Sequence, residues 1–532
     1  MTLQNGSPRR IALTRRHTLL AGAVALGLSA CSSRRPDGSP GGSGPGGKPQ
    51  RGGELRMPVT QEPIAPAFDM GTAAASSVGT AAIATLAYNG LVEFRDGEVV
   101  PELATAWEQV SPTRYVLELR KGVEFHDGTP FDSAAVKANF DRLLDPDGDG
   151  VNLPPFLESV ETDGTHTVVM NLGKPAASFL PSLRRGRVMM MSPSAVEKHA
   201  ESDPFRASVG TGPYVFMEYA AGDSIRLERN DDYWAEDNYL DAITLPIIPN
   251  TSTQIQAFLN GEFDLVGVVP AQARQVLRRE GAVLHEDIGN TFNYLSFNLA
   301  RPPFDNIDVR RAFSAALDRE GIAEGVYAGY AGPASGPFSP AIGEAYEDLS
   351  DLPMQSYSPD EARDYLSRSG FDTGNEVSFS AFTQSPWSEE ADAMTAQLEE
   401  IGVAIDLNKE DFGSWAERVY TAKDFTMFNS GQTTRTVDPD EVIYPLVHSG
   451  GDLNVSGVSD DELDALLDRA RAEADAGSRA EMYRDVARMV ADKAYAAFTV
   501  WPANLFVSGP GLGGYEFSPG GTHPAARAWL AS

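Results

Sequence analysis

The stretch from residue 291 to 319 constrains the fold most, because it has the pattern of a strand followed by a helix near mid-chain. Apolar side chains alternate on both sides of its first seven residues, so both faces of the strand should be buried. Two prolines then end strand pairing, and Asp305 or Asn306 can cap the helix that follows. Apolar residues recur there at helical spacing. Three arginines fall outside this apolar stripe: Arg310, Arg311 and Arg319.

A strand that is buried on both faces and leads into a new helix is typical of a chain crossing from one lobe to another. The chain has 532 residues, too many for one hydrophobic core, so two or three domains are expected. A cleft between lobes is a usual place for a small ligand. The formal net charge of −32 argues against nucleic acid and against anionic membrane surfaces as partners.

Residues 1–30 are expected to be a signal peptide. Four arginines precede an apolar run, Thr18–Leu28, that is too short to span a membrane permanently. The run ends in Leu-Ser-Ala-Cys, which resembles a bacterial lipobox with Cys31 as the lipidated first residue of the mature chain. Arg15-Arg16 also resembles a twin-arginine signal, so export by the Tat or the Sec route stays open. The alternative is a free cysteine after an ordinary signal peptide.

Cys31 is the only cysteine in the sequence, so no disulfide can form within the chain and no cysteine metal site is expected. Residues 31–53 are rich in Gly, Pro and Ser, which is typical of a flexible tether. Together these features predict an extracytoplasmic protein that is anchored to the lipid bilayer of the bacterial cell membrane through acylated Cys31.

Several motifs between residues 101 and 312 resemble one family. They are Trp107-Glu108, Leu119–Phe131, Val209–Tyr214, Leu227–Asn230, Tyr233-Trp234, Asn260–Asp264, Pro302–Phe304 and Val309–Ala312. In this order they resemble the solute-binding proteins of peptide-type ABC importers, the extracellular solute-binding protein family 5. The resemblance covers about residues 52 to 520.

The resemblance implies an α/β fold: a two-lobed periplasmic-binding-protein clamp, type II-like with an extra small subdomain, whose mixed sheets are flanked by helices. It places the main part of the first lobe in residues 52–92, 205–288 and 499–532. The small subdomain would be 93–204 and the second lobe 289–498. It also implies a monomer that delivers a peptide or peptide-like solute to the transmembrane subunits of an ABC permease, without a cofactor or a bound metal.

Enzyme motifs are weak in this chain. Its seven histidines show no H-E-x-x-H spacing, and no G-x-S-x-G segment is present. Residues Gly509–Gly514 satisfy G-x-G-x-x-G, but no helix pattern follows, so a loop is expected. The alternative function is a secreted, lipid-anchored hydrolase. Within the receptor class, an oligosaccharide, an opine-like compound or a metal chelate could replace the peptide.

The ligand-contact candidates are polar and aromatic residues in segments expected to be loops facing the cleft: Gln61, Trp387, Asn429, Gln432, Thr434, Arg435 and Asp438. In peptide-binding members, a Gly-Trp-x-x-Asp segment supplies an aspartate for the peptide's α-ammonium group. Aligned on Asp438-Pro439, this chain has Arg435 in the aspartate position and Gln432 in the tryptophan position. The resemblance therefore implies that a free ammonium is repelled there. Ordinary loop surface, with Arg435 facing solvent, is the alternative.

Overall fold

The computed structural model of the protein describes residues 48–60, 70, 78–95, 98–145, 154, 156–184, 188–199, 203–235, 237–287, 291–433, 438–515 and 524–531. All of them belong to one compact unit, Gly41–Ser532.

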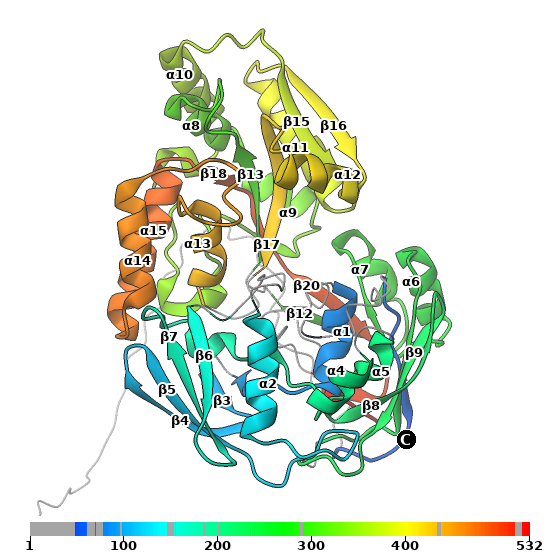
Figure 1. The fold of residues 1–532 in the computed structure, drawn as a ribbon. Helices are drawn as coiled ribbons and strands as arrows, with labels where there is room; N and C mark the ends of the chain where they lie inside the picture. Colours follow the sequence, from blue (N-terminus) through cyan, green and yellow to red (C-terminus); the bar gives the residue numbers. More distant parts are fainter. Residues whose placement is uncertain are drawn as a thin grey trace, which may run out of the picture. The chain divides into compact units, whose positions relative to one another are not determined.

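The strand predicted at residue 291 lies inside a five-stranded sheet (Figure 1). In spatial order, the strands are β16 (Ile405–Glu410), β15 (Val377–Phe382), β17 (Met427–Thr433), β13 (Thr291–Phe297) and β18 (Ala496–Phe498). β13 is antiparallel to both of its neighbours, while β15 runs parallel to β16 and β17. We call the described residues 291–502 the second lobe.

Both faces of β13 are buried, as the sequence predicts. Leu295 and Phe297 belong to one hydrophobic core, and Phe292 and Tyr294 belong to another. Helices cover both sides of the sheet: α8 (Ile307–Ala315), α9 (Arg319–Gly325), α10 (Pro359–Ser369), α11 (Trp387–Glu400), α12 (Phe412–Ala416), α13 (Asp440–Val447), α14 (Asp461–Ala472) and α15 (Ala476–Asp492). A two-stranded sheet of β14 (Ala331–Pro333) and β19 (Val500–Pro502) completes this lobe. Asn306, rather than Asp305, caps α8, because its side-chain oxygen accepts from the N–H of Asp308.

The described residues 48–287 and 504–531 form what we call the first lobe. Its main part holds a four-stranded sheet of β1 (Glu54–Arg56), β10 (Ala242–Pro246), β9 (Ser224–Arg229) and β8 (Tyr214–Ala220). A second sheet contains β11 (Leu265–Gly267), β20 (Asn504–Ser508) and β12 (Val283–Asp287). The remaining elements are α1 (Val78–Ala87), α5 (Pro204–Ala207), α6 (Thr251–Leu259), α7 (Pro270–Val276), β21 (Leu512–Gly513) and β22 (Trp529–Leu530).

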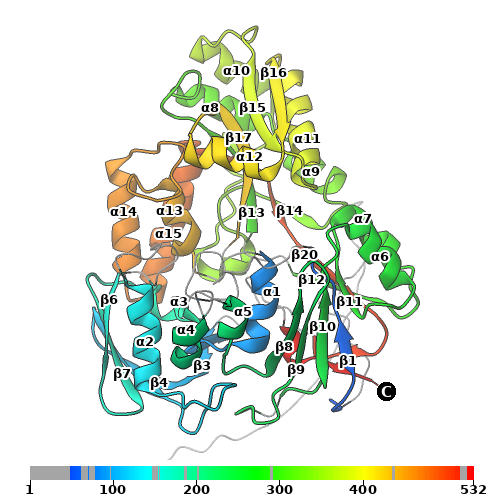
Figure 2. The same ribbon diagram turned by 45° about the vertical axis from the view of Figure 1, so that its right-hand side comes forward.

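A smaller antiparallel sheet occupies residues 104–172 of the first lobe. Its order is β4 (Ala104–Ser111), β5 (Arg114–Leu119), β7 (Thr167–Leu172) and β6 (Leu157–Thr162). With it come the hairpin of β2 (Val92–Arg95) and β3 (Glu98–Pro101) and the helices α2 (Ser133–Leu143), α3 (Phe179–Ser182) and α4 (Pro193–His199). Asp132 caps α2. Both views place this sheet next to α14 (Figures 1 and 2).

The chain passes between the two lobes at two points. It leaves β12 at Asp287 and enters β13 at Thr291, and it returns from β19 to β20 through Ala503. Ala503 donates its N–H to the carbonyl of Tyr330, so the return segment is tied to the second lobe. These two crossings flank the space between the lobes, which is where the ligand site is expected.

Candidate ligand-binding cleft

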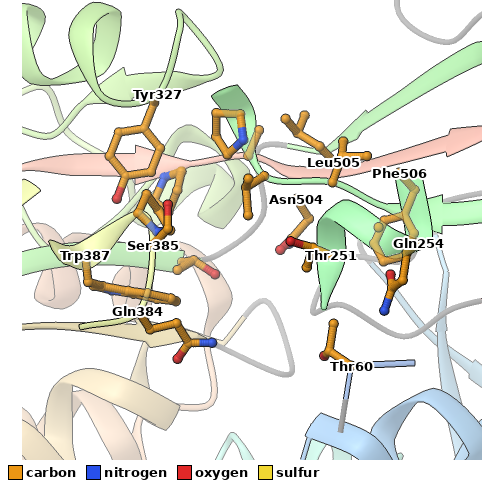
Figure 3. A pocket seen from close by; sticks show the side chains of 18 of the residues that line it. Thr60, Thr251, Gln254, Tyr327, Gln384, Ser385, Trp387, Asn504, Leu505 and Phe506 are labelled. Atoms are coloured by element: carbon orange, nitrogen blue, oxygen red, sulfur yellow. The ribbon is translucent and has the colours of Figure 1, made fainter. Parts of the chain in front are cut away.

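A cavity of 420 Å³ lies between the two lobes and is lined from both of them. Figure 3 shows Tyr327, Ser385 and Trp387 on one side and Thr251, Gln254 and Phe506 across from them. The lining residues of the first lobe are Met57–Thr60, Thr251, Gln254, Gly267–Pro270 and Asn504–Phe506. Those of the second lobe and the return crossing are Thr291, Asn293, Tyr327, Gln384–Trp387, Pro502 and Ala503.

The cavity walls come from the ends of strands and helices. β13 contributes its first residues, the segment from Gln384 to Trp387 joins β15 to α11, and β20 contributes its beginning. Asn293 and Asn504–Phe506 are paired in their strand ladders, so the polarity of the cavity at these strands comes from side chains. Loops and the ends of elements can carry such polar side chains without disturbing the cores behind them.

Trp387 and Asn429 were predicted as ligand contacts, and the structure brings these two residues together. Trp387 is the first residue of α11, and its indole packs against Phe382 with ring centroids 5.3 Å apart. The side-chain amide of Asn429 donates to the main-chain carbonyl of Trp387 over 2.9 Å. Trp387 lines the cavity, whereas Asn429 lies behind it and is 1% exposed. Their contact with a ligand stays a prediction.

The segment expected to be a polar loop is partly a strand. Asn429 and Gln432 lie in β17, where Asn429 is opposite Leu295 and Gln432 is opposite Phe292. Side chains alternate along a strand, so Gln432 points to the face opposite that of Asn429 and Gly431. Gln432 is not among the residues that line the cavity, and its role in ligand contact is untested.

Asp438 already has a partner inside the protein. Its carboxylate receives two hydrogen bonds from the guanidinium of Arg479, at 2.7 and 2.9 Å, and both side chains are largely buried. The neighbouring Asp440 is paired in the same way with Arg471 at 2.9 Å and accepts from the hydroxyl of Tyr483. Ligand binding by Asp438 therefore remains a prediction that must compete with this ion pair.

Four other predicted residues lie outside the described residues: Gln61, Thr434, Arg435 and the lipidation candidate Cys31. Thr60, which directly precedes Gln61, does line the cavity.

Sequence reasoning missed a buried polar cluster behind the cavity wall. Glu390 is 0% exposed and accepts hydrogen bonds from the side-chain amide of Asn293 (2.7 Å), from the hydroxyl of Tyr327 (2.8 Å) and from the hydroxyl of Thr499. Burial raises the pKa of the Glu390 carboxyl, and these hydrogen bonds oppose the rise. The sequence contains one signal for this cluster: Glu390 falls on the same face of helix α11 as the apolar residues Met394 and Leu398. A carboxylate on a buried face needs hydrogen-bond partners.

The turn around His126 is held by hydrogen bonds. Its main-chain N–H donates to the carbonyl of Gly210, and its ring Nε2 lies 2.9 Å from the carbonyl oxygen of Gly212. His126 thus connects the small sheet to the segment before β8. Among the residues that the structure describes, no group of three His, Cys, Asp or Glu side chains is arranged to hold a metal ion. No helix within the same residues combines the length and apolarity that a membrane span requires.

A family comparison agrees with this architecture. Residues 98–454 match the family of bacterial extracellular solute-binding proteins, family 5 (middle region). The chain belongs to this family. It is therefore a solute-binding protein of the kind that serves ABC importers.

Individual relatives agree on the class but differ in ligand. Heme-binding protein A of Haemophilus influenzae is 28% identical over 469 residues, which cover 82% of this chain and 85% of that protein. Glutathione-binding protein GsiB of Pectobacterium atrosepticum is 27% identical over 420 residues, covering 75% and 79%. The structure of the ABC transporter substrate-binding protein CtaP of Listeria monocytogenes has a TM-score of 0.82 and 25% identity, covering 91% of this chain and 100% of that one.

Proposed function

We propose that this protein is a lipid-anchored extracytoplasmic receptor that captures a peptide or peptide-like solute between its lobes and delivers it to the permease of an ABC importer. The observation that carries the proposal is the 420 Å³ cavity lined from both lobes and flanked by the two chain crossings. Cavities of about 300–1,000 Å³ are typical of sites for small organic ligands.

The choice of a peptide-like solute rests on two supports. The cavity combines apolar surface from residues such as Phe506 and Val268 with amide and hydroxyl groups from Asn293, Gln384 and Thr251, which suits a short chain of amides. One relative is named for binding glutathione, which is itself a small peptide. Another is named for binding heme, so the ligand has to be identified directly.

The position of Arg435 bears on the kind of peptide. The side chains of Asp438 and Asp440 each already pair with an arginine, so neither is free to replace the aspartate that peptide-binding members use for an α-ammonium group. We propose that Arg435 disfavours a free ammonium and favours a blocked end, a carboxylate or a phosphate.

A serine–histidine pair in the first lobe bears on the rival hydrolase. The Nε2 atom of His285 lies 2.8 Å from the Oγ atom of Ser508. Ser508 is only 1% exposed and sits in β20 across from β12, so a substrate cannot reach it without unfolding this sheet. The pair therefore gives no support to hydrolysis.

The proposal is tested by identifying the solute that the protein carries. The full-length protein is purified from its membrane fraction without denaturation, and the released small molecules are analysed by mass spectrometry. A peptide or amide-rich solute present at near one equivalent is expected. A lipid, a nucleotide or heme at one equivalent would contradict the peptide-like assignment and leave the receptor class intact.

A further inference from the structure

The described wall of the cavity carries no formal charge. Of the residues that line it, none is Asp, Glu, Lys, Arg or His, although ten of them have polar side-chain atoms. The chain as a whole is strongly charged, so a wall of this size without a single charge differs from the rest of the surface. Building on the proposed function, we propose that this wall selects an uncharged ligand group that both donates and accepts hydrogen bonds, and discriminates against an ammonium or a carboxylate at that position.

One carboxylate behind this wall, that of Glu390, is withdrawn from the ligand. Two of the lining residues, Asn293 and Tyr327, direct their donors backward to Glu390. A third donor, the hydroxyl of Thr499, completes the set. These three hydrogen bonds occupy the Glu390 carboxyl within the protein, and its burial keeps a ligand from touching it. Glu390 is therefore not available as a counter-ion for a ligand ammonium. An ammonium placed against Asn293 and Tyr327 would therefore lose its water without gaining Glu390 as a charged partner, which is costly.

Two neutral polar atoms next to the cavity have no partner among the described residues. They are the side-chain oxygen of Asn293, an acceptor, and the indole Nε1 of Trp387, a donor. Both lie beside Gly431. A hypothetical Cβ atom on this glycine would lie 2.5 Å from the Asn293 oxygen and 3.4 Å from the Trp387 nitrogen. Both are shielded from water, and an unpaired buried polar atom destabilises the free protein by about 1–3 kcal/mol.

A ligand that shifts these side chains toward the cavity can relieve this cost if it brings complementary groups. An N–H or O–H of the ligand satisfies Asn293, and a carbonyl or hydroxyl oxygen satisfies Trp387, so an amide or a pair of hydroxyls fits where a single ion does not. The shared chemistry is a neutral donor–acceptor group, which can come from a blocked peptide or from an oligosaccharide.

The test uses four probes on the full-length protein, freed of any carried solute, with isothermal titration calorimetry. N-acetyl-tri-alanine amide is neutral, tri-alanine amide is a cation, N-acetyl-tri-alanine is an anion, and maltotriose is a neutral sugar. We expect a neutral probe to bind at least about tenfold more tightly than either charged peptide, because the charged ends lose water without a partner.

A charge placed in the wall should change this preference. Gln384 is exposed and lines the cavity, so Gln384→Glu adds a carboxylate without changing the size of the side chain. This variant should bind tri-alanine amide more tightly and N-acetyl-tri-alanine more weakly than the wild type. The matched control is Gln109→Glu, which makes the same change on an exposed residue of β4 that does not line the cavity and should leave all four affinities unchanged.

The indole can be tested separately. Trp387→Phe removes the unpartnered N–H and keeps a ring, so the affinity for the neutral probe should fall about three- to tenfold while the melting temperature of the ligand-free protein does not fall. Its control is Trp234→Phe, because the Nε1 atom of Trp234 donates to Asn89 over 3.3 Å in the first lobe. That variant should lower the melting temperature and leave the affinity unchanged. An equal effect of both substitutions on affinity would contradict the inference.

The probes also separate this inference from the proposed function. Tighter binding of a charged peptide would overturn the inference while supporting a peptide receptor. Tight binding of maltotriose alone would support the inference and overturn the peptide-like assignment. Tighter binding of the neutral peptide supports both, and no binding of any probe counts against both.

Discussion

Single buried charges in this protein are held by partners that lie both near and far away in the sequence. Arg319 is 5% exposed and donates to the carbonyl oxygens of Ala334, Phe498, Ser314 and Leu317. Burial lowers the pKa of its guanidinium to about 10, which still leaves it charged at neutral pH. Five fixed donors let one arginine tie the end of α8 to strand β18 and to the residue after β14, so its position off the apolar stripe did not make it a surface residue.

Arg479→Ala should destabilise the protein by about 3–5 kcal/mol, because it leaves the buried Asp438 carboxylate without its partner. The ion pair is bidentate, and its side chains are 13% and 8% exposed. Urea unfolding followed by circular dichroism measures the change. The control is Arg363→Ala, which breaks an exposed pair with Asp360 and should cost no more than about 1 kcal/mol. Equal losses in both variants would contradict this account of Asp438.

The proposed role of Arg435 predicts a preference between two matched peptides. Calorimetry with a free and an N-acetylated peptide of the same sequence should show weaker binding of the free form. The expected loss in affinity is about two to three and a half decades, which is the cost of leaving a buried ammonium without a charged partner. Arg435→Ala should reduce this difference. Tight binding of the free peptide to the wild type, unaffected by the substitution, would refute the role.

At the scale of elements, the segments that join strands carry the connections between parts of the fold. Glu102 lies between β3 and β4 and accepts from the Asn89 side chain at 2.7 Å and from the Gly90 N–H at 2.9 Å, so it fixes the end of α1 against the small sheet. A second connection joins the lobes: the N–H of Ala177 donates to the carbonyl of Arg471, and the hydroxyl of Ser178 donates to Asp440. The lobes therefore touch at α13 and α14 as well as at the crossings.

Glu102 gives the element-scale pH prediction. Burial, followed by the nearby charge of Glu93, raises the pKa of Glu102 from 4.5 to about 8. The folded state then holds this proton more tightly than the unfolded state, so the free energy of unfolding should fall as the pH rises from about 4.5 to about 8. The loss approaches about 5 kcal/mol for a fully shielded carboxyl and is smaller here because Glu102 keeps some exposure.

Denaturant unfolding at pH 5, 6.5 and 8 measures this slope. Glu102→Gln keeps the shape of the side chain and cannot ionise, so it should flatten the pH dependence in this range. A slope that is the same in the variant and in the wild type would show that other groups cause it.

At the scale of the whole molecule, two lobes joined by two neighbouring crossings are suited to opening and closing around a ligand. The strand segments next to the two crossings, residues 294–298 and 498–502, are candidates for the pivots. β13 is paired on both sides throughout Tyr294–Ser296, so bending there would break strand pairing. At the crossings the chain changes sheet, from β12 to β13 and from β19 to β20. We therefore expect the pivot at the crossings.

Ligand-induced closure should appear in small-angle X-ray scattering as a smaller radius of gyration once the cavity is filled. The protein is measured after removal of its carried solute and again with saturating ligand, whose binding is verified by calorimetry. Identical scattering curves with a verified bound ligand would contradict closure.

The proposed membrane anchoring depends on one residue. Two acyl chains are needed for stable membrane attachment, and we propose that Cys31 carries a diacylglyceryl group through its sulfur. Cys31→Ser should release the protein into the medium or block its processing, which cell fractionation followed by immunoblotting detects. Unchanged membrane retention of the variant would refute lipidation at this position.

The sequence by itself determined the strand from residue 291, the capped helix after it and the family, because each of these rests on local spacing or on ordered motifs. It also pointed to Trp387, which lines the cavity. Only the tertiary structure decided that Asn429 and Gln432 belong to a strand and that Asp438 is held by Arg479. It also decided that Asn293, Tyr327, Glu390 and Thr499 meet behind the cleft.

The physical reason is the range of the interactions. Hydrophobic periodicity and capping act over a few residues, so they can be followed along the chain. The partners of Glu390 are 63 to 109 residues away from it, and the cavity is closed by segments from both ends of the chain. Which polar groups meet there depends on how the sheets pack, and a single sequence carries no local pattern for that.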